Sequence, residues 1–224
     1  MEKRGLSQEG LKIIACVTML IDHLGAIGLG GVGFRVVGRM AFPIYCFLLA
    51  EGVHHTRHPG RYGLRLAVGA VLSEIPFDLL FFGRITWLHQ SVMVTLLLGF
   101  LFGMAVKKVS NDGSRVLLAV PFCLLGQVCM ADYGGLGVAM IAVFILTRGG
   151  SRMVQAGTLA LVCFLIGGGW VRIGPVMIPM EMFGLLALVP IYCYSGRKAT
   201  RSGAVQGLFY LFYPAHLTAL LLWR

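Results

Sequence analysis

Long apolar runs constrain this chain more than any other feature of its sequence. Hydrophobic residues make up 58% of the 224 residues, charged residues only 12%, and the mean hydropathy is +0.84. A soluble domain carries about 25% charged residues. The runs lack the period-two alternation of a membrane β-barrel. The sequence therefore predicts an all-α, polytopic transmembrane helical bundle, with a single integral-membrane domain over residues 1–224.

Nine segments are apolar enough to cross a bilayer, since a helix needs about 20 residues for a ~30 Å core. The expected spans are 10–29, 35–53, 63–82, 90–106, 115–130, 133–147, 153–168, 178–194 and 204–222. The fifth and sixth, joined by a tight turn at Ala131–Tyr133, could instead form one broken or re-entrant element. Basic residues concentrate in alternate connections, which predicts an inner N-terminus and an outer C-terminus. The residues of the predicted inner side are Lys3, Arg4, Arg57, Arg61, Arg65, Lys107, Lys108, Arg115, Arg148, Arg152, Arg197, Lys198 and Arg201.

Charge and cysteine usage exclude some other classes of protein. A net charge of +10 could indicate nucleic-acid binding in a soluble protein, but here Lys and Arg lie in short connections. We therefore expect membrane lipids around the chain and no nucleic-acid partner. The six cysteines lie in apolar runs without C-x-x-C spacing, which is typical of packing residues. His54, His55 and His58 share a basic loop without an acidic or cysteine ligand, so we expect no metal site.

Several ionisable residues fall inside the predicted spans, where burial in lipid is costly. On the predicted topology they gather in the outer half of the membrane: Asp22, His23, Arg39, Asp78, Asp132, Glu181 and His216. This common depth predicts one polar cavity near the outer leaflet. Arg39 could pair with Asp22 or Asp78, either as part of a site or as structural glue.

The two intramembrane histidines are the best candidates for proton transfer near neutral pH. Asp22 and His23 are sequence neighbours and point about 100° apart on a helix, so each needs a partner on another helix. Glu74 and Asp78 share one helix face around Pro76, which is typical of a cavity lining, although Asp78 could merely cap the helix. A histidine in an apolar helix can also be a simple packing residue.

Blocks along nearly the whole chain resemble the TraX family, bacterial membrane proteins associated with N-terminal acetylation of conjugative pilin. The matching blocks, in chain order, are Leu11–Ile14, Met19–Gly25, Gly38–Pro43, Ala50–Gly52, His55–Arg57, Ser73–Asp78, Thr95–Gly99, Asp132–Gly134 with Gly137, and Phe212–Leu217. Ser91 departs from the pattern, because the family is expected to carry Asn there.

The resemblance implies an acetyltransferase in the bacterial cytoplasmic (inner) membrane. It would move an acetyl group from acetyl-CoA to the N-terminal amine of a pilin subunit, or to another outer acceptor such as a glycan. We expect His23 as general base, His216 as second base or acyl relay, and Asp22 or Asp78 to orient an imidazole. Residues expected at the substrate are Arg39, Glu51, Glu74, Thr95, Asp132 and Tyr213.

The cosubstrate would approach from the cytoplasm, where Arg57, Arg61 and Arg65 could bind its phosphates. Anionic lipid headgroups explain the same arginines equally well. Two other functions stay open. Ionisable residues inside spans also occur in proton-coupled transporters of small solutes, although no internal repeat is evident. The chain could also be a non-catalytic membrane subunit of a conjugation apparatus.

Overall fold

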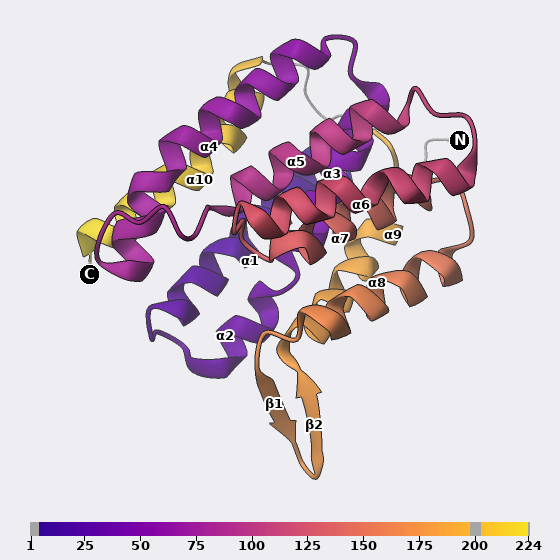
Figure 1. Ribbon diagram of the computed structural model, residues 1–224. Helices are drawn as coiled ribbons and strands as arrows, with labels where there is room; N and C mark the ends of the chain where they lie inside the picture. The colour runs from indigo at the N-terminus through magenta and orange to yellow at the C-terminus, as the bar shows by residue number, and fades with distance from the viewer. Residues whose placement is uncertain (1–4, 198–202, 224) are drawn as a thin grey trace. The chain divides into compact units, whose positions relative to one another are not determined.

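The computed structural model describes residues 5–197 and 203–223, and each predicted span contains helix (Figure 1). The predicted inner residues Lys3, Arg4, Lys198 and Arg201 lie outside these ranges. The chain divides into two compact units, and each takes two stretches of sequence. Unit 1 comprises the described residues within Met1–Leu48 and Arg152–Phe209; unit 2 comprises those within Leu49–Ser151 and Tyr210–Arg224. The expectation of a single domain stays a prediction.

Unit 1 is built around three helical contacts: α1 packs against α2, and the 3₁₀ helix η1 packs against both α2 and α8. Its elements are α1 (Gln8–Ala26), α2 (Gly31–Gly38), the first half of α3 (Ala41–His55), α8 (Arg152–Ile166), β1 (Trp170–Ile173), β2 (Val176–Pro179), η1 (Met180–Ala187), α9 (Leu188–Tyr192) and the start of α10 (Gly203–Trp223). The segment after α9 returns to the segment before α1, where Leu6 N donates to Cys193 O at 2.8 Å.

Unit 2 is a packed set of helices in which α5 contacts α4, α6 and α7, and α6 contacts α7. Its elements are the end of α3, α4 (Pro59–Phe82), α5 (Val92–Val106), α6 (Asp112–Val128), α7 (Gly134–Leu146) and most of α10. Phe102, Val106 and Ala142 form a buried cluster against residues of α6 and α7. Glycine permits the close approach of α5 and α7, because a Cβ at Gly99 would lie 2.3 Å from Ile141 Cδ1.

Local signals in the sequence fix where several helices begin and end. The Ser7 hydroxyl caps α1 by accepting a hydrogen bond from Gly10 N at 3.1 Å, and Asn111 caps α6 through Ser114 N at 3.0 Å. Pro59 occupies the first position of α4, where its missing N–H costs nothing. Gly83 ends α4 in the left-handed region with φ of 66°.

Three segments differ in detail from the predicted spans. The second is interrupted by a tight turn at Arg39–Met40 between α2 and α3, and the eighth contains η1 rather than a regular α-helix. The antiparallel hairpin β1–β2 was not predicted, although every other named element of the described chain is a helix, as expected. The fifth and sixth segments form two separate helices, α6 and α7, rather than one broken element.

Two helical stretches among the described residues are long and apolar enough to cross a membrane, Gly31–His55 and Val205–Trp223. Other helices expose apolar side chains along one face. On α4 the stripe is Leu64, Val68, Val71 and Ile75; on α6 it is Leu117, Val120, Leu124 and Val128. Spacings of three and four residues place each set on a single helix face. The nine-span topology itself stays a prediction.

Candidate functional site

A buried network of ion pairs connects three elements of unit 1. Arg39, in the turn after α2, donates through Nη2 to Asp22 Oδ2 on α1 and through Nη1 to Glu181 Oε1 on η1. Arg35 Nη1 on α2 donates to the same Asp22 oxygen at 2.7 Å and to the Asp22 carbonyl at 3.1 Å. Two arginines thus alternate with two carboxylates, and their formal charges balance.

The backbone brings these groups together through two glycines. A Cβ at Gly38 would lie 2.6 Å from the Asp22 Cα, so the close approach of α2 to α1 requires a residue without a side chain. Glu181 N donates to Gly167 O at 3.2 Å, which fixes the start of η1 beside the end of α8. Glu181 is therefore held in place by its main chain as well as by Arg39.

Sequence reasoning found part of this network. The structure pairs Arg39 with Asp22, the first of its two expected partners, and not with Asp78. The sequence grouped Glu181 with Asp22 and Arg39 but did not predict its pairing with Arg39, and it did not single out Arg35. The signal for Arg35 is its spacing of four from Arg39 on one helical turn. His23 is half-buried one residue beyond Asp22 and points in another direction, as helix geometry requires.

A second polar cluster lies in unit 2, where carboxylates accept hydrogen bonds from neutral groups. Glu74 Oε1 accepts from Ser91 N at 3.0 Å and from the Ser91 hydroxyl at 2.8 Å. Asp78 Oδ2 accepts from Thr86 N at 2.8 Å, and its other oxygen, Oδ1, is buried without a hydrogen-bond partner in the described part of the chain. Asp78 therefore ties the loop between α4 and α5 to α4 rather than simply capping its own helix.

Asp132 occupies a tightly constrained turn between α6 and α7. The flanking Met130 and Tyr133 have φ of 50° and 62°, and no other non-glycine residue among those described has a positive φ. Such backbone strain persists only where surrounding contacts enforce it. Here Asp132 N donates to Gln90 O at 2.9 Å, and the Asp132 carbonyl accepts from the Thr95 hydroxyl at 2.6 Å. Thr95, an expected substrate residue, thus holds the strained turn.

Helix α10 adds a tyrosine and a histidine to unit 2. Tyr213 is buried, and its ring lies 5.5 Å from the His216 ring, measured between centroids. The buried His216 ring stacks on Phe212, with centroids 4.8 Å apart, and its Nδ1 lies 2.7 Å from the Phe212 carbonyl oxygen. Because a carbonyl only accepts hydrogen bonds, Nδ1 carries the proton. In the neutral ring, Nε2 is then the basic nitrogen.

The two clusters differ in how their carboxylates are compensated. In unit 1 each carboxylate of the network is paired with arginine. In unit 2, no Lys or Arg within residues 5–197 and 203–223 forms an ion pair with Glu74 or Asp78. Balanced ion pairs are typical of structural glue, whereas unit 2 offers two carboxylates outside ion pairs and a histidine with a defined tautomer, groups that suit proton transfer. The unit 2 cluster is therefore the better candidate for chemistry.

The remaining predicted residues lie near the other end of unit 2. Glu51 pairs with Arg148 at 2.8 Å and lies 3.7 Å from His55, so its carboxylate is engaged by cations. Arg57, Arg61 and Arg65 are exposed, and the Arg65 guanidinium lies over the Tyr210 ring at 5.9 Å. Within the described ranges, no group of three or more His, Cys, Asp or Glu side chains has an arrangement that could hold a metal ion.

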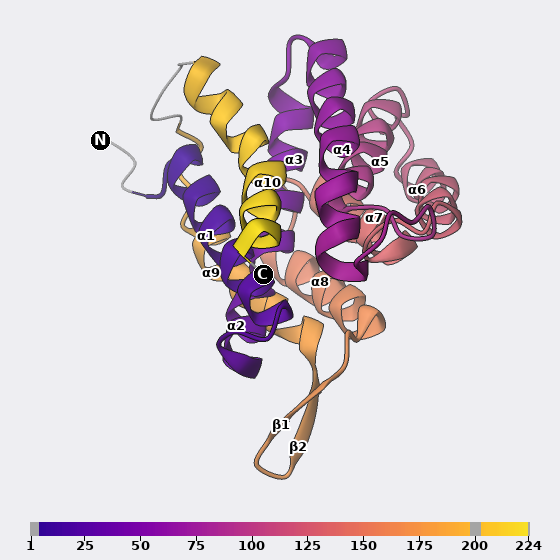
Figure 2. The same cartoon turned by 90° about the vertical axis from the view of Figure 1, so that its left-hand side faces the viewer.

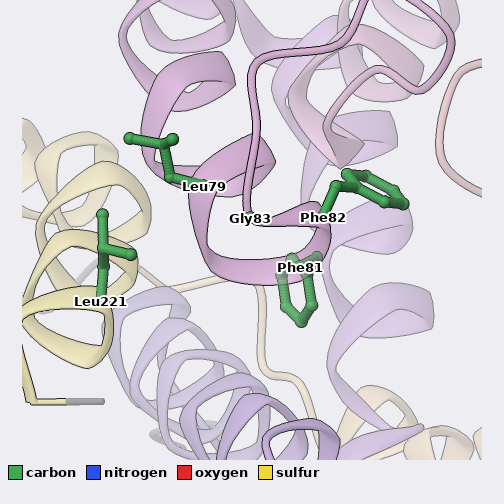
Figure 3. Close-up of a pocket in the computed structure, with 5 residues that line it drawn as sticks. All are labelled: Leu79, Phe81, Phe82, Gly83 and Leu221. Atoms are coloured by element: carbon green, nitrogen blue, oxygen red, sulfur yellow. The ribbon is translucent and has the colours of Figure 1, made fainter.

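A cavity of about 410 Å³ opens at the end of α4 in unit 2. Leu79, Phe81, Phe82 and Gly83 line it from α4 and the turn that follows, and Leu221 lines it from α10 (Figure 3). All of these lining side chains are apolar, so they supply no group for acid–base chemistry. The cavity is separate from the residues expected at the substrate.

Comparisons with known proteins identify the family. The chain is 26% identical over 228 residues to the probable fimbrial assembly protein FimC, serogroup H1, of Dichelobacter nodosus, and the alignment covers 94% of this chain and 92% of that protein. No solved structure matches the chain. The sequence profile described as TraX protein matches residues 7–224. Since that match spans almost the entire sequence, the chain belongs to the TraX family.

Proposed function

We propose that this protein is a membrane-embedded acetyltransferase that acts in pilus or fimbria assembly. The observation that carries the proposal is membership of the TraX family over residues 7–224, supported by the similarity to a probable fimbrial assembly protein. The donor is acetyl-CoA. The acceptor is the N-terminal amine of a pilin subunit or another amine or glycan on the outer side of the membrane.

The unit 2 cluster supplies a general base for this reaction. The acceptor nitrogen attacks the thioester carbonyl carbon, the C–S bond breaks, and His216 Nε2 takes the proton that the nitrogen loses. That proton then returns to the departing CoA thiolate. The Phe212 carbonyl fixes the His216 tautomer for this step, at 2.7 Å from Nδ1. Glu74, Asp132 and Tyr213 are the residues of unit 2 that we expect to position the acceptor, and His23 is the second candidate base.

Multi-pass insertion in the bacterial inner membrane is part of the proposal. It is supported by the two long apolar stretches and by the exposed apolar stripes of α4 and α6. On α4 the buried residues include Ser73 and Asp78, so the polar groups face inward while the apolar stripe faces outward. This pattern is the reverse of a soluble protein's and suits contact with lipid chains.

The cosubstrate fits the basic end of α4. Arg57, Arg61 and Arg65 are exposed and spaced by four residues, and Arg61 and Arg65 share one face of α4. Guanidinium groups at this spacing suit the phosphate groups of CoA. Anionic lipid headgroups are the competing ligand, and the KM for acetyl-CoA of an Arg61→Ala/Arg65→Ala variant distinguishes the two. A higher KM is expected if the arginines bind the cosubstrate.

Transfer of labelled acetyl groups tests the proposal directly. The protein, purified into lipid nanodiscs, is supplied with labelled acetyl-CoA and a pilin subunit, and the product is followed by intact mass. We expect transfer by the native chain, a loss of at least about 100-fold in His216→Ala, and little change in His89→Ala. His89 is exposed in an outer loop and serves as the matched control. Undiminished acetylation in both His216→Ala and His23→Ala would rule out the proposed mechanism.

A further inference from the structure

The chain has three tryptophans, and all three are strongly exposed. Trp87 is 87% exposed in the loop between α4 and α5, Trp170 is 62% exposed at the start of β1, and Trp223 is 66% exposed in the last turn of α10. On the predicted topology, each lies at the outer end of a span, and the inner connections contain none. Tryptophan is enriched at membrane–water interfaces, where its ring is apolar and its N–H is polar.

Apolar side chains cover both faces of the β1–β2 hairpin. Its register pairs Val171 with Ile178 and Ile173 with Val176, so one face consists of branched aliphatic residues. The other face carries Trp170 and Met177 with Arg172. In both views the hairpin extends away from the helices of its own unit (Figures 1 and 2). A peptide added to a strand edge would leave both faces uncovered, whereas lipid can cover both at once.

Part of the hairpin's backbone is satisfied without water. The strands pair with each other, and Arg172 Nε donates to the turn carbonyl of Gly174 at 3.2 Å. The outer strand edges still carry polar groups, which are too costly to bury in the hydrocarbon core. The hairpin therefore suits the boundary between headgroups and acyl chains, where interfacial elements lie about 5–10 Å deep. Arg172 can reach phosphates from this depth.

The loop between α4 and α5 in unit 2 has the same properties. Ile85 and Leu88 are exposed beside Trp87. Side chains bind part of its main chain: Leu88 N donates to the Thr86 hydroxyl at 3.2 Å, and Gln90 Nε2 donates to Trp87 O at 3.0 Å. Thr86 N is bound by Asp78. An exposed apolar loop whose polar backbone groups have internal partners suits a medium with little water.

We infer that the β1–β2 hairpin, the Trp87 loop and the Trp223 end of α10 lie in the outer interfacial layer of the bilayer, in contact with phospholipid headgroups and the first acyl carbons. These elements are thus anchors that set the depth of the protein in the membrane. The inference depends on membrane insertion and not on acetyl transfer, so it can fail or succeed independently of the proposed reaction.

Fluorescence of the native tryptophans tests this placement. Three variants, each with two of the tryptophans changed to Phe, leave Trp87, Trp170 or Trp223 as the single reporter. Each is reconstituted in phosphatidylcholine vesicles whose acyl chains carry bromine at graded depths. We expect the shallowest bromines to quench most strongly, and aqueous iodide to quench several-fold less than it quenches free N-acetyltryptophanamide.

Two results would overturn the inference. Strong iodide quenching without bromine quenching would place the tryptophans in water, as for a surface that a protein partner covers. Strongest quenching by the deepest bromines would place them in the hydrocarbon core. Ile173→Asp at the hairpin tip provides a matched variant. It should reduce bromine quenching of Trp170 and leave Trp87 unchanged, whereas no effect on Trp170 would contradict contact of the hairpin with lipid.

Discussion

Arg39 lies between two buried carboxylates, and its loss would leave both without their shared cation. Its side chain is only 7% exposed, so water cannot replace the guanidinium. Removing one partner of a buried ion pair costs about 3–5 kcal/mol. We therefore expect Arg39→Ala to lower the free energy of unfolding by that amount, measured by denaturant titration in detergent micelles.

Arg35→Ala provides the matched comparison for that substitution. Arg35 contacts the same Asp22 oxygen, but its side chain is 31% exposed, and a partly solvated pair contributes about 1 kcal/mol or less. We therefore predict a large decrease in the free energy of unfolding for Arg39→Ala and a small decrease for Arg35→Ala. Equal losses would show that burial does not govern this network.

Ser91 is the position where the family is expected to carry Asn. Its hydroxyl donates to Glu74 at 2.8 Å, and a carboxamide could donate in the same way. We predict that Ser91→Asn keeps both stability and acetyl transfer. Ser91→Ala should destabilise the protein by about 1.5–3 kcal/mol, because a hydrogen bond to a charged group is lost. Parallel unfolding and activity assays compare the two, and a neutral Ser91→Ala would contradict the assigned contact.

At the scale of helices, close packing through glycine makes a clear prediction. Gly99 lies where α5 meets α7, and a new Cβ there would overlap Ile141. Gly99→Ala should destabilise the protein by about 1–3 kcal/mol through overpacking. Gly157 on α8 has nothing within 4 Å of an added Cβ, so Gly157→Ala should be neutral or stabilising by up to about 1 kcal/mol. Thermal unfolding of both variants in the same detergent checks the contrast.

Helix positions followed from the sequence because long apolar runs, caps and turn glycines are local signals. The hairpin was missed because most of it, residues 170–177, lies in the short connection between the seventh and eighth predicted spans, where strands of four residues give little periodic signal. The interruption at Arg39 was missed for a different reason. It depends on the packing of Gly38 against α1, which is a tertiary contact.

In the candidate site, too, the sequence predicts the features that have local signals and misses those that depend on tertiary contacts. The predicted depth in the membrane was enough to group Asp22, Arg39 and Glu181, because ionisable residues inside a span must find partners. Their pairing could not be predicted, since it depends on contacts between distant segments such as Arg39 and Glu181. The grouping of His23 with Asp78 and His216 at one site stays a prediction.

For the whole molecule, two native cysteines report the predicted topology. Cys129 and Cys193 are both exposed and lie at the predicted outer and inner ends of their spans. In variants that keep only one of them, an impermeant thiol reagent should label Cys129 in intact cells. Cys193 should be labelled only after permeabilisation. Labelling of both from the same side would contradict the odd number of crossings between them.

The balanced charges of the Arg35, Asp22, Arg39 and Glu181 network have an electrical consequence. A single charge moved across 100 mV changes in energy by about 2.3 kcal/mol. Two cations and two anions held together experience almost no net force in such a field, so this part of the protein can shift without performing electrical work. On the predicted topology, a change in membrane voltage would therefore exert little net force on the helices joined by these four side chains.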